Sequence, residues 1–567
     1  MSVAKRAQGL EGGPATGEPG TVPGGEPGRT DGTAGDGQVA ERTNERSELQ
    51  EHLDVRGQRR WVFPRAALVG AGAGGVALLF RAALTEAGVL TNGLLAWAHG
   101  LAVLGWVFPV LCTLVGAAVA AWLAGRYAPE ASGSGIPHLE AVLLRFRQLD
   151  WKRVLPVKFF GGVLAIGSGL ALGREGPTVQ MGGAVGDALS RWLKVSPRER
   201  LTLISAGGGA GLAAAFNAPL SGLMFVLEEM RRDFHPVVFG ATFVASVVAD
   251  IITRLGSSQF PIFSVPNYPV SPLSALPVFA LLGLAAGGLG IVFNRSLLAM
   301  VGAFARLPRR FVLPAAALTG GLVGLVAWFF PSLWGSGDHL IDMLLQGNVA
   351  LALVPSFFVL RLLMTTGSYA TGAPGGIFAP LLALGAMIGL AVGQLGHMLA
   401  PGVVPIAGVF AVVGMAAYFA AIVRAPLTGI MLILEMTGSY NQMLPLLVSC
   451  FCAYALAEWL QDKPIYEALL ERDLERGGET SLLKEPVVVD FTILPGAPFE
   501  GKALRALGLP PGCIVLRCSD GKREWVPRAD TRLAAHTRIT VEIGPDTSDA
   551  LEILRRGCAP VREAQRR

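Results

Sequence analysis

Charged residues are scarce in this sequence. Only 16% of its 567 residues are Asp, Glu, Lys or Arg, whereas 52% are hydrophobic, and the mean hydropathy is +0.50. A soluble chain of this length needs more charge on its surface, and long apolar runs of this kind are typical of membrane spans. The composition therefore predicts a polytopic membrane protein, and the reading of the whole sequence favours the inner membrane of the cell.

Cysteine and histidine are also few. The six cysteines show neither Cys-x-x-Cys spacing nor a disulfide-dense framework, and the seven histidines are scattered without metal-ligand spacing. We therefore expect no metal site and no organic cofactor. The net charge of +5 is modest and gives no reason to expect a nucleic-acid partner.

Large apolar residues are almost absent from residues 1–60, which are rich in Gly, Glu, Arg, Pro and Thr. We predict a disordered N-terminal tail there. No charged start followed by a short apolar region and a cleavage site appears after Met1, so we predict no signal peptide. Four arginines flank the start of the first apolar run (Arg56, Arg59, Arg60 and Arg65). The positive-inside rule then puts the N-terminus in the cytoplasm, and we expect the C-terminus there as well.

Long apolar stretches follow along the chain, separated by basic clusters. The stretches lie at about 66–84, 93–124, 236–255, 274–302, 311–330, 349–365, 377–400, 405–423 and 425–460. Three basic clusters lie between the second and third stretches: Arg145 to Lys158, Arg191 to Arg200, and Arg231 with Arg232. If all three clusters are cytoplasmic, each segment between them leaves the cytoplasm and returns.

The segment 159–190 is too short to cross the bilayer twice. Each leg has roughly 14 residues, about 21 Å at the helical rise, against about 30 Å of hydrocarbon. We predict half-helices that meet at Glu175 near the midplane. The same arithmetic puts residues 217–219 at the turn of the pair 201–230. Broken helices around a midplane site are typical of transporters.

Glu175 itself lies in the run Gly-Arg-Glu-Gly-Pro at residues 173–177, between two apolar stretches. A charged side chain near the bilayer centre costs about 2.5–3.5 kcal/mol, so an acid there indicates function, with a proton or an ion as its partner. Pro177 suits the first turn of a new helix. The free N–H groups of that helix would face Glu175 and form an anion site.

The chain repeats itself. Residues 218–228 recur at 425–435 with seven of eleven positions identical, and Gly-x-x-x-Pro at 173–177 recurs at 376–380. Matching breaks predict an internal duplication with a site at the interface of the repeats, while the pattern alone leaves open whether the halves are parallel or inverted. Glu228 and Glu435 occupy the same repeat position, so we expect them to cap or buttress equivalent helices without a role in transport.

The character of the chain changes after Trp459. Residues 461–484 are charged and helical in pattern, the segments 487–491, 513–517 and 539–543 are typical of short β-strands, and 546–556 is typical of a closing helix. We predict a small cytoplasmic α/β domain within residues 476–567.

Four motifs together resemble those of the CLC family of chloride channels and proton-coupled chloride transporters. They are Gly-Ser-Gly-Ile-Pro at 133–137, Gly-Arg-Glu-Gly-Pro at 173–177, Gly-Ile-Phe-Ala-Pro at 376–380 and Lys-Pro-Ile-Tyr at 463–466. The resemblance covers about 61–475. It implies an all-α polytopic membrane fold, an internal inverted repeat of tilted and half-spanning helices, and a homodimer in lipid with an anion pathway in each subunit.

The resemblance also implies roles for particular residues. Ser134 and Tyr466 would bind the central chloride through their hydroxyl groups, and Ile377 and Phe378 through their backbone N–H groups. Glu175 would be the gating glutamate, which occupies an anion site when it is ionised and leaves that site when it is protonated.

A second acid bears on whether the protein is an exchanger or a channel. Glu229 matches the inner glutamate that carries protons in exchangers of the family, which favours chloride/proton antiport, while a passive chloride channel of the same family stays as the alternative. The intact Gly-Ser-Gly-Ile-Pro motif favours chloride over fluoride, with nitrate as a competitor. A non-transporting membrane sensor is a further alternative. An enzyme is disfavoured because Gly-x-Ser-x-Gly, His-Glu-x-x-His and a second acid beside Glu175 are missing.

The segment 489–552 resembles the TrkA-C type of regulatory domain found in potassium-conductance regulators. This resemblance implies binding of an unidentified small ligand, or dimerisation.

Overall fold

The protein is described from a computed structural model, which describes residues 33–101, 104–256, 262–263, 265–266, 268–347, 349–476, 487–520, 523–544 and 550–559. The chain divides into two units, Met1–Asp54 and Val55–Arg567. Helix α1 (Thr33–His99) begins inside the stretch 1–60 for which the sequence predicts a disordered tail. Residues 1–32 of that stretch lie outside the described residues. The part from residue 33 to residue 60 is helical, and its sequence is rich in Arg, Glu and Gln, which are good helix formers.

The first half of the membrane domain follows α1. It contains α2 (Val107–Tyr127), α3 (Ile136–Leu143), α4 (Trp151–Gly167), α5 (Glu175–Trp192), α6 (Pro197–Phe216), α7 (Pro219–Phe225), the π-helical turn η2 (Val226–Met230) and α8 (Pro236–Gly256). Helix α1 packs on α6 and α8 through small residues: the backbone of Ala245 and Ala249 leaves no room for a side chain at Gly70 and Gly74.

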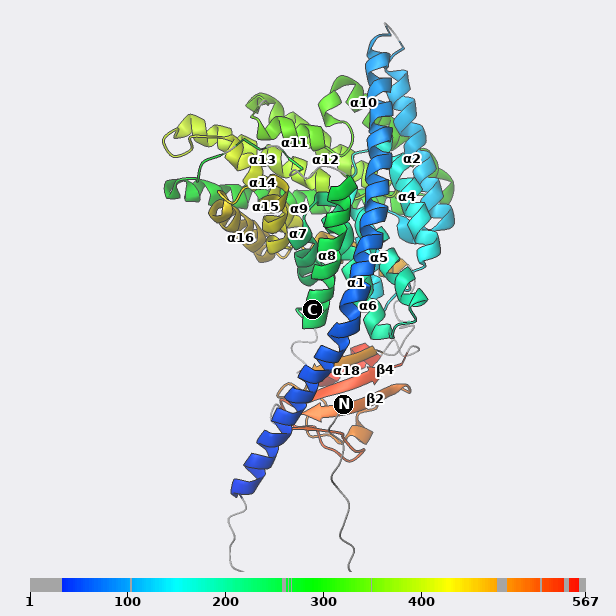
Figure 1. Cartoon of the computed structure of the whole chain (residues 1–567), viewed down its shortest axis with the longest axis vertical. Coiled ribbons are helices and arrows are strands. Elements are labelled where there is room, and N and C mark those ends of the chain that lie inside the picture. The colour runs from blue at the N-terminus through cyan, green and yellow to red at the C-terminus, as the bar shows by residue number, and fades with distance from the viewer. Residues whose placement is uncertain are drawn as a thin grey trace, which may run out of the picture. The chain divides into compact units, whose positions relative to one another are not determined.

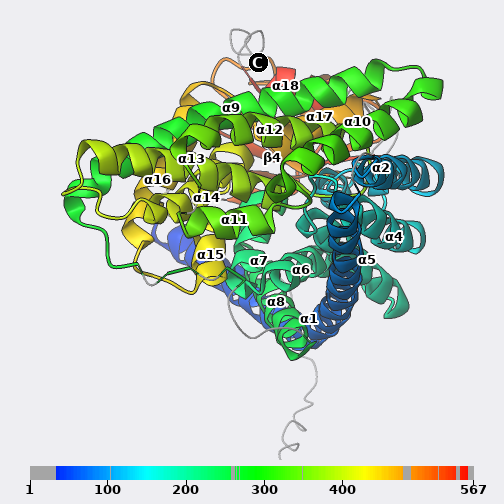
Figure 2. The same ribbon diagram turned by 90° about the horizontal axis from the view of Figure 1, so that it is seen from above.

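The second half has the same order of elements. It contains α9 (Leu276–Arg306), α10 (Arg309–Phe329), α11 (Asp338–Leu345), α12 (Val354–Ala370), α13 (Phe378–Leu399), α14 (Gly408–Val423), α15 (Pro426–Thr437), α16 (Met443–Trp459) and α17 (Ile465–Arg476). Equivalent pairs pack closely in both halves, α5 on α6 and α13 on α14, and α2 lies beside α10 (Figure 1; Figure 2). Seven helices of the described part of the chain are long and apolar enough to cross a membrane, which agrees with a multi-pass membrane protein.

The predicted helix breaks are present, but the legs between them are longer than expected. Helix α4 has 17 residues and α5 has 18, about 26 and 27 Å long at the helical rise, where the sequence predicts roughly 14 residues each. The difference arises because both helices continue into the basic clusters, whereas the sequence pattern predicts that the helices end before these clusters. The second break falls at Asn217, whose left-handed backbone ends α6, and the following helix α7 has only seven residues.

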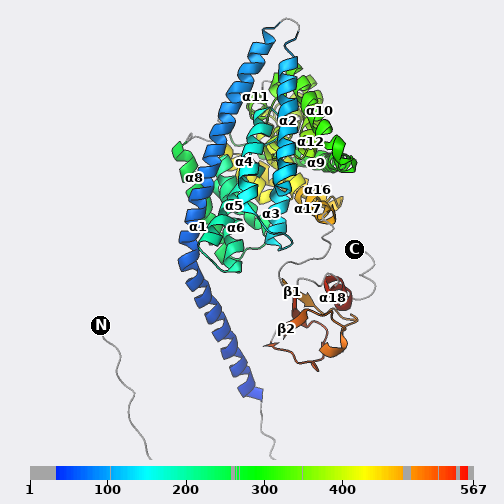
Figure 3. The same cartoon turned by 90° about the vertical axis from the view of Figure 1, so that its right-hand side faces the viewer.

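The two halves make reciprocal contacts. Gly173 and Gly376 form an antiparallel bridge, in which the N–H of each donates to the carbonyl oxygen of the other, at 2.8 and 2.7 Å. Contacts of this kind arise when a two-fold axis relates the halves. The equivalent helices α3 and α11 lie toward opposite ends of the membrane domain (Figure 3). The repeat is therefore inverted, which the pattern of the sequence alone leaves open.

The repeated glutamates cap helices of the opposite half, as predicted. Glu228 accepts hydrogen bonds from the backbone N–H groups of Leu427 (3.1 Å) and Thr428 (2.7 Å) at the start of α15. Glu435 accepts them from Leu220 (3.0 Å) and Ser221 (2.8 Å) at the start of α7. Each carboxylate thus satisfies N–H groups that have no partner within their own helix.

The C-terminal domain is a four-stranded antiparallel sheet of strand order β1-β4-β2-β3. Its elements are β1 (Val487–Thr492), β2 (Cys513–Ser519), β3 (Glu524–Trp525), β4 (Arg538–Ile543) and α18 (Ala550–Cys558). The three predicted strands are confirmed to within two residues, and only the two-residue β3 was not expected. The predicted closing helix begins at Ala550 within the described residues, and the start predicted for it, at 546–549, lies outside them.

Candidate anion-binding site

Three loops converge where the halves meet. The carbonyl of Gly133, before α3, accepts a hydrogen bond of 2.9 Å from the N–H of Gly375, before α13, and Gly376 is bridged to Gly173, before α5. A Cβ atom at Gly376 would lie 2.8 Å from the backbone nitrogen of Gly176, so the loops can approach only because glycine is present. This packing brings together the N-termini of three helices, α3, α5 and α13.

Glu175 is the first residue of α5 and is 1% exposed. Its carboxylate interacts with the backbone N–H of its own residue and with that of Ala379, in the first turn of α13. Its Oε2 atom has no hydrogen-bond partner within the described residues. The carboxylate therefore lies at the N-terminus of a helix from the other half, where free N–H groups and the helix dipole favour a negative charge.

Ile377 and Phe378 are both fully buried at the start of α13. Residues in the first turn of a helix have N–H groups without an intrahelical acceptor, so those of Ile377 and Phe378 are available to an anion. The ring of Phe378 stacks on that of Tyr466, with 6.1 Å between centroids, and packs against Phe225 and Phe419. This aromatic packing fixes the position of the first turn.

Both residues predicted to bind the anion through a hydroxyl group lie at this junction. Ser134 is fully buried, and a Cβ atom at Gly176, next to Glu175, would lie 2.9 Å from the Cα of Ser134. Tyr466 is the second residue of α17 and is fully buried, and its hydroxyl group has no hydrogen-bond partner among the residues described. A buried hydroxyl without a partner is rare and indicates a missing ligand or water.

Tyr369 was missed by the sequence reasoning. Tyr369 lies at the end of α12, and its hydroxyl oxygen is 3.3 Å from the Oγ of Ser134. The signal in the sequence was a run of polar residues in an otherwise apolar helix, Thr365, Thr366, Ser368 and Tyr369. All four are buried, so their polar groups face the protein interior.

Buried cations hold the loops from behind and were also missed. The Lys158 ammonium donates to the carbonyls of Ala131 (2.9 Å) and Gly133 (2.7 Å). Arg361, at the equivalent position 203 residues later, donates to Leu333 (2.9 Å) and Gly335 (2.7 Å). The Arg361 loop carries Gly-Ser-Gly at 335–337, a copy of 133–135 that the repeat offset could have revealed. Both cations bind backbone carbonyls, so the N–H groups at the loops face the site.

Arg174, directly before Glu175, lines a cavity of about 340 Å³ together with Ser336, Asp338 and His339. The cavity also involves α1 between residues 84 and 92, the end of α4 and the segment before α11, on the side of the membrane domain where α11 lies (Figure 3). An ion that enters there reaches the loop carrying Glu175. Within the described residues no group of three or more His, Cys, Asp or Glu side chains is arranged to hold a metal ion.

Glu229 is not part of the loop junction. It lies in the π-helical turn η2 and is 3% exposed, with its Oε1 atom 3.9 Å from the Nη2 atom of Arg232. Arg232 in turn donates to Glu467 at 2.9 Å, and both of these side chains are exposed to solvent. Glu140 of α3, another buried acid that was missed, interacts electrostatically with Glu229. Glu229 thus lies between a surface ion pair and the interior.

A multi-pass membrane protein with interrupted helices, whose N-termini surround a buried acid and a hydroxyl without a partner, belongs to the class of ion channels and ion transporters. The particular family follows from comparison with known proteins. The family model described as voltage gated chloride channel matches residues 116–458, more than half of the chain, and the TrkA-C domain model matches residues 488–554. The chain belongs to the voltage gated chloride channel family, that is, the CLC family, and carries a C-terminal TrkA-C domain.

Relatives of known name agree with this assignment. The H(+)/Cl(-) exchange transporter ClcA of Vibrio parahaemolyticus is 41% identical over 416 residues, which cover 72% of this chain and 89% of the relative. ClcA of Citrobacter koseri is 39% identical over 418 residues, 72% of this chain and 88% of that protein. The crystal structure of a slow cyanobacterial Cl-/H+ antiporter is 37% identical, with a TM-score of 0.71 over 74% of this chain and 99% of that one. These comparisons confirm the family and the fold class that the four motifs imply.

Proposed function

We propose that this protein exchanges chloride for protons across the membrane, with Glu175 as the group that closes the anion pathway and carries the proton. One observation carries the proposal: the Glu175 carboxylate lies against the first-turn N–H groups of α13, in the position that a bound anion would take. The named relatives, which are exchange transporters for the same two ions, support it.

The geometry supports a competition between the carboxylate and chloride. When Glu175 is ionised, it fills the site at the helix N-terminus and blocks the pathway. Protonation removes the negative charge that holds it there, and a chloride ion can then replace it. Ile377 and Phe378 would bind the ion through backbone N–H groups, and Ser134 and Tyr466 through hydroxyl groups. Lys158 and Arg361 would not trap the ion, because both are bound to backbone carbonyls.

Glu229 is our candidate for the inner proton carrier. It is buried beside the Arg232–Glu467 ion pair, so a proton from solvent reaches it after passing these two exposed side chains. Tyr466 interacts electrostatically with both Glu229 and Glu175 and therefore lies near the route between them.

Further features of the proposal rest on sequence patterns. The basic clusters favour an orientation in the inner membrane with both termini in the cytoplasm. The CLC motifs favour chloride over fluoride and a homodimer with one pathway in each subunit. We propose that the TrkA-C domain binds a small regulatory ligand, and that the protein catalyses no covalent reaction.

The test is a flux measurement on purified protein in chloride-loaded liposomes, with the membrane potential clamped so that proton leak cannot imitate coupling. An outward chloride gradient should drive protons against their own gradient, and Glu175→Ala should abolish this movement. The control is Glu86→Ala, the same change at an exposed acid of α1, which should behave as the unmodified protein.

Chloride efflux without proton movement in the unmodified protein would make it a passive channel. Absence of any chloride flux would favour the non-transporting sensor.

A further inference from the structure

A second cavity lies away from the anion site. It measures about 380 Å³ and is formed by the start of the membrane part of α1, the start of α6 and the segment from the end of η2 to the start of α8. Arg65, Arg198, Arg231 and His235 line it, one or more from each of these three segments. The three arginines lie far apart in the sequence, so the fold gathers them at one place.

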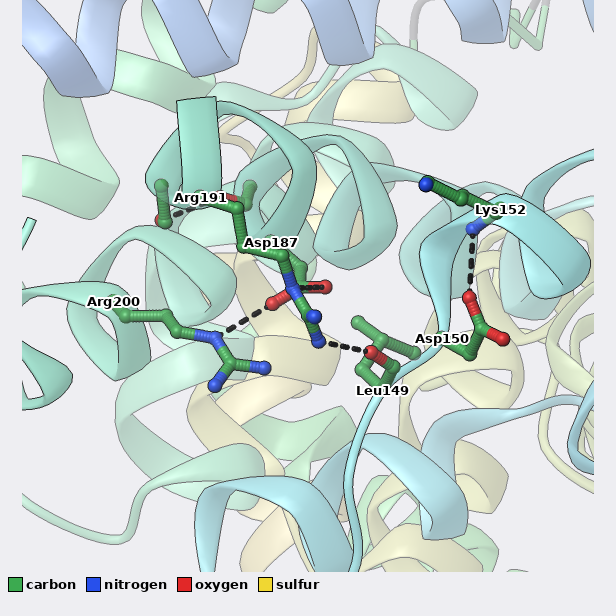
Figure 4. A network of polar contacts seen from close by, with 8 residues as sticks. Leu149, Asp150, Lys152, Asp187, Arg191 and Arg200 are labelled. Carbon is green, nitrogen blue, oxygen red and sulfur yellow. Dashed lines mark hydrogen bonds and ion pairs between the residues drawn. The ribbon is translucent and has the colours of Figure 1, made fainter. Parts of the chain in front are cut away.

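Most arginines at this end of the domain are neutralised by an acid. The buried Asp187 accepts hydrogen bonds from Arg191 (3.0 Å) and Arg200 (2.7 Å), as Figure 4 shows. Arg65 pairs with Glu199 at 2.6 Å, inside the cavity wall. The acids at this end of the domain therefore form ion pairs with particular arginines.

Arg198 and Arg231 are different, because neither makes an ion pair or a side-chain hydrogen bond within the part of the chain that the structure describes. Burial lowers the pKa of Arg231; Asp233 opposes this shift, and the nearby guanidinium groups of Arg145 and Arg198 add to it. Asp233 thus compensates only part of the positive charge. The cavity has unneutralised guanidinium groups on two walls, which is the arrangement that binds a phosphate.

The mouth of the cavity is apolar. Trp61 is 63% exposed there, and the apolar wall includes Val62 of α1 and Val237 of α8. The same two helices expose Leu68 and Phe239 farther along, so the apolar surface continues beyond the cavity. A tryptophan between a basic pocket and an apolar surface is typical of the level of lipid headgroups. The ligand that fits both parts has an anionic head and an apolar tail.

We propose that this cavity binds the phosphate headgroup of an anionic phospholipid from the leaflet at the basic end of the domain, with Arg198 and Arg231 contacting the phosphate. The positive-inside rule makes this the cytoplasmic leaflet, which is rich in anionic lipid. The site shares no residue with the anion site, so the proposal stands or falls independently of Glu175.

The experiment measures the thermal unfolding midpoint of the purified full chain in detergent as phosphatidylglycerol is added, with phosphatidylcholine and soluble glycerol 3-phosphate as comparisons. Phosphatidylglycerol should raise the midpoint in a saturable manner and the other two should not. The double variant Arg198→Gln/Arg231→Gln should bind about 30-fold more weakly, since each basic residue near an anionic lipid is worth about fivefold in affinity. Lipid retained through purification, measured by mass spectrometry, should fall in parallel.

The matched control is Lys152→Gln/Lys194→Gln, which removes the same charge from exposed positions that do not line the cavity. It should keep the affinity of the unmodified protein. If the half-buried Arg231 is needed for folding, the exposed Arg198→Gln alone keeps the test and should weaken binding about fivefold. Equal loss in the control would overturn the proposal, because general surface charge would then explain binding. A shift with glycerol 3-phosphate that depends on the same arginines would overturn the lipid assignment in favour of a soluble phosphate compound.

Discussion

The two halves of the membrane domain share a scaffold but not a chemistry. Gly173 and Gly376 form one bridge between equivalent loops, and Glu228 and Glu435 cap equivalent helices of the opposite half. Each of these tasks needs the same residue type twice, because a two-fold axis makes the two environments alike. These glycines and glutamates, which the repeat preserves, therefore have structural roles.

The acids assigned to transport break the repeat. Glu175 corresponds to Phe378 in the second half, 203 residues later, and Glu229 corresponds to Met436, 207 residues later. The first half thus supplies the carboxylate at the loop junction, while the second supplies the free N–H groups and the aromatic packing of α13. A site made at a symmetry axis becomes a directed pathway only when its two sides differ. The comparison teaches that titratable residues found in one half alone are the candidates for function.

The sharpest way to break this comparison is to exchange neighbouring acids, one unrepeated and one repeated. Glu229→Gln should lower coupled proton flux about 100-fold or more, as expected when a positioned proton-transfer group is lost, while chloride flux continues. Glu228→Gln is the matched control. It should keep proton coupling and lower the thermal unfolding midpoint, because Glu228 holds the first turn of α15. The measurement is paired proton and chloride flux from the same liposomes.

Equal loss of coupling in both variants would contradict the distinction between repeated and unrepeated acids. Proton flux that survives Glu229→Gln would remove Glu229 from the proton route.

The buried cations Lys158 and Arg361 occupy equivalent positions, so their variants test whether equivalent loops matter equally for stability and for chloride binding. Lys158→Met and Arg361→Met should each reduce the free energy of unfolding by about 2–3 kcal/mol, because each leaves buried carbonyl groups without a donor. Only Lys158→Met should also weaken chloride binding, since the Lys158 ammonium holds Gly133, next to Ser134. Thermal unfolding and calorimetric chloride titration of the folded fraction separate the two effects. Weaker chloride binding in Arg361→Met to the same degree would show that the two loops are functionally equivalent.

The sequence predicted the breaks in the helices better than their ends. The breaks at Glu175 and Asn217 were accessible because a proline follows each by two residues, and proline suits the first turn of a new helix. The ends of α4 and α5 were not, because charged residues at an interface continue a helix as readily as they end it. The same effect explains why α1 begins at Thr33, within the predicted tail.

Contacts between side chains and loops distant in the sequence could not be predicted from the sequence. The roles of Tyr369 and Lys158 depend on which loop each side chain reaches, 235 residues away for Tyr369 and 25 for Lys158. No local pattern encodes such a distance. By contrast, the capping roles of Glu228 and Glu435 could be predicted, because the repeat states the equivalence directly and leaves only the partner to be found.

The smallest expected effect comes from the two serines of the repeated Gly-Ser-Gly loops. The Ser134 hydroxyl faces Tyr369 at the junction, whereas the Ser336 hydroxyl donates to Asp338 at 3.0 Å, on the loop that lines the cavity beside Arg174. Ser134→Ala should weaken chloride binding about fivefold, the value of one net hydrogen bond near 1 kcal/mol, and Ser336→Ala should leave it unchanged. Calorimetric chloride titration of both variants distinguishes them. A loss of chloride binding in Ser336→Ala alone would place the anion site at the other copy of the loop. The second half, and not the first, would then supply the serine ligand.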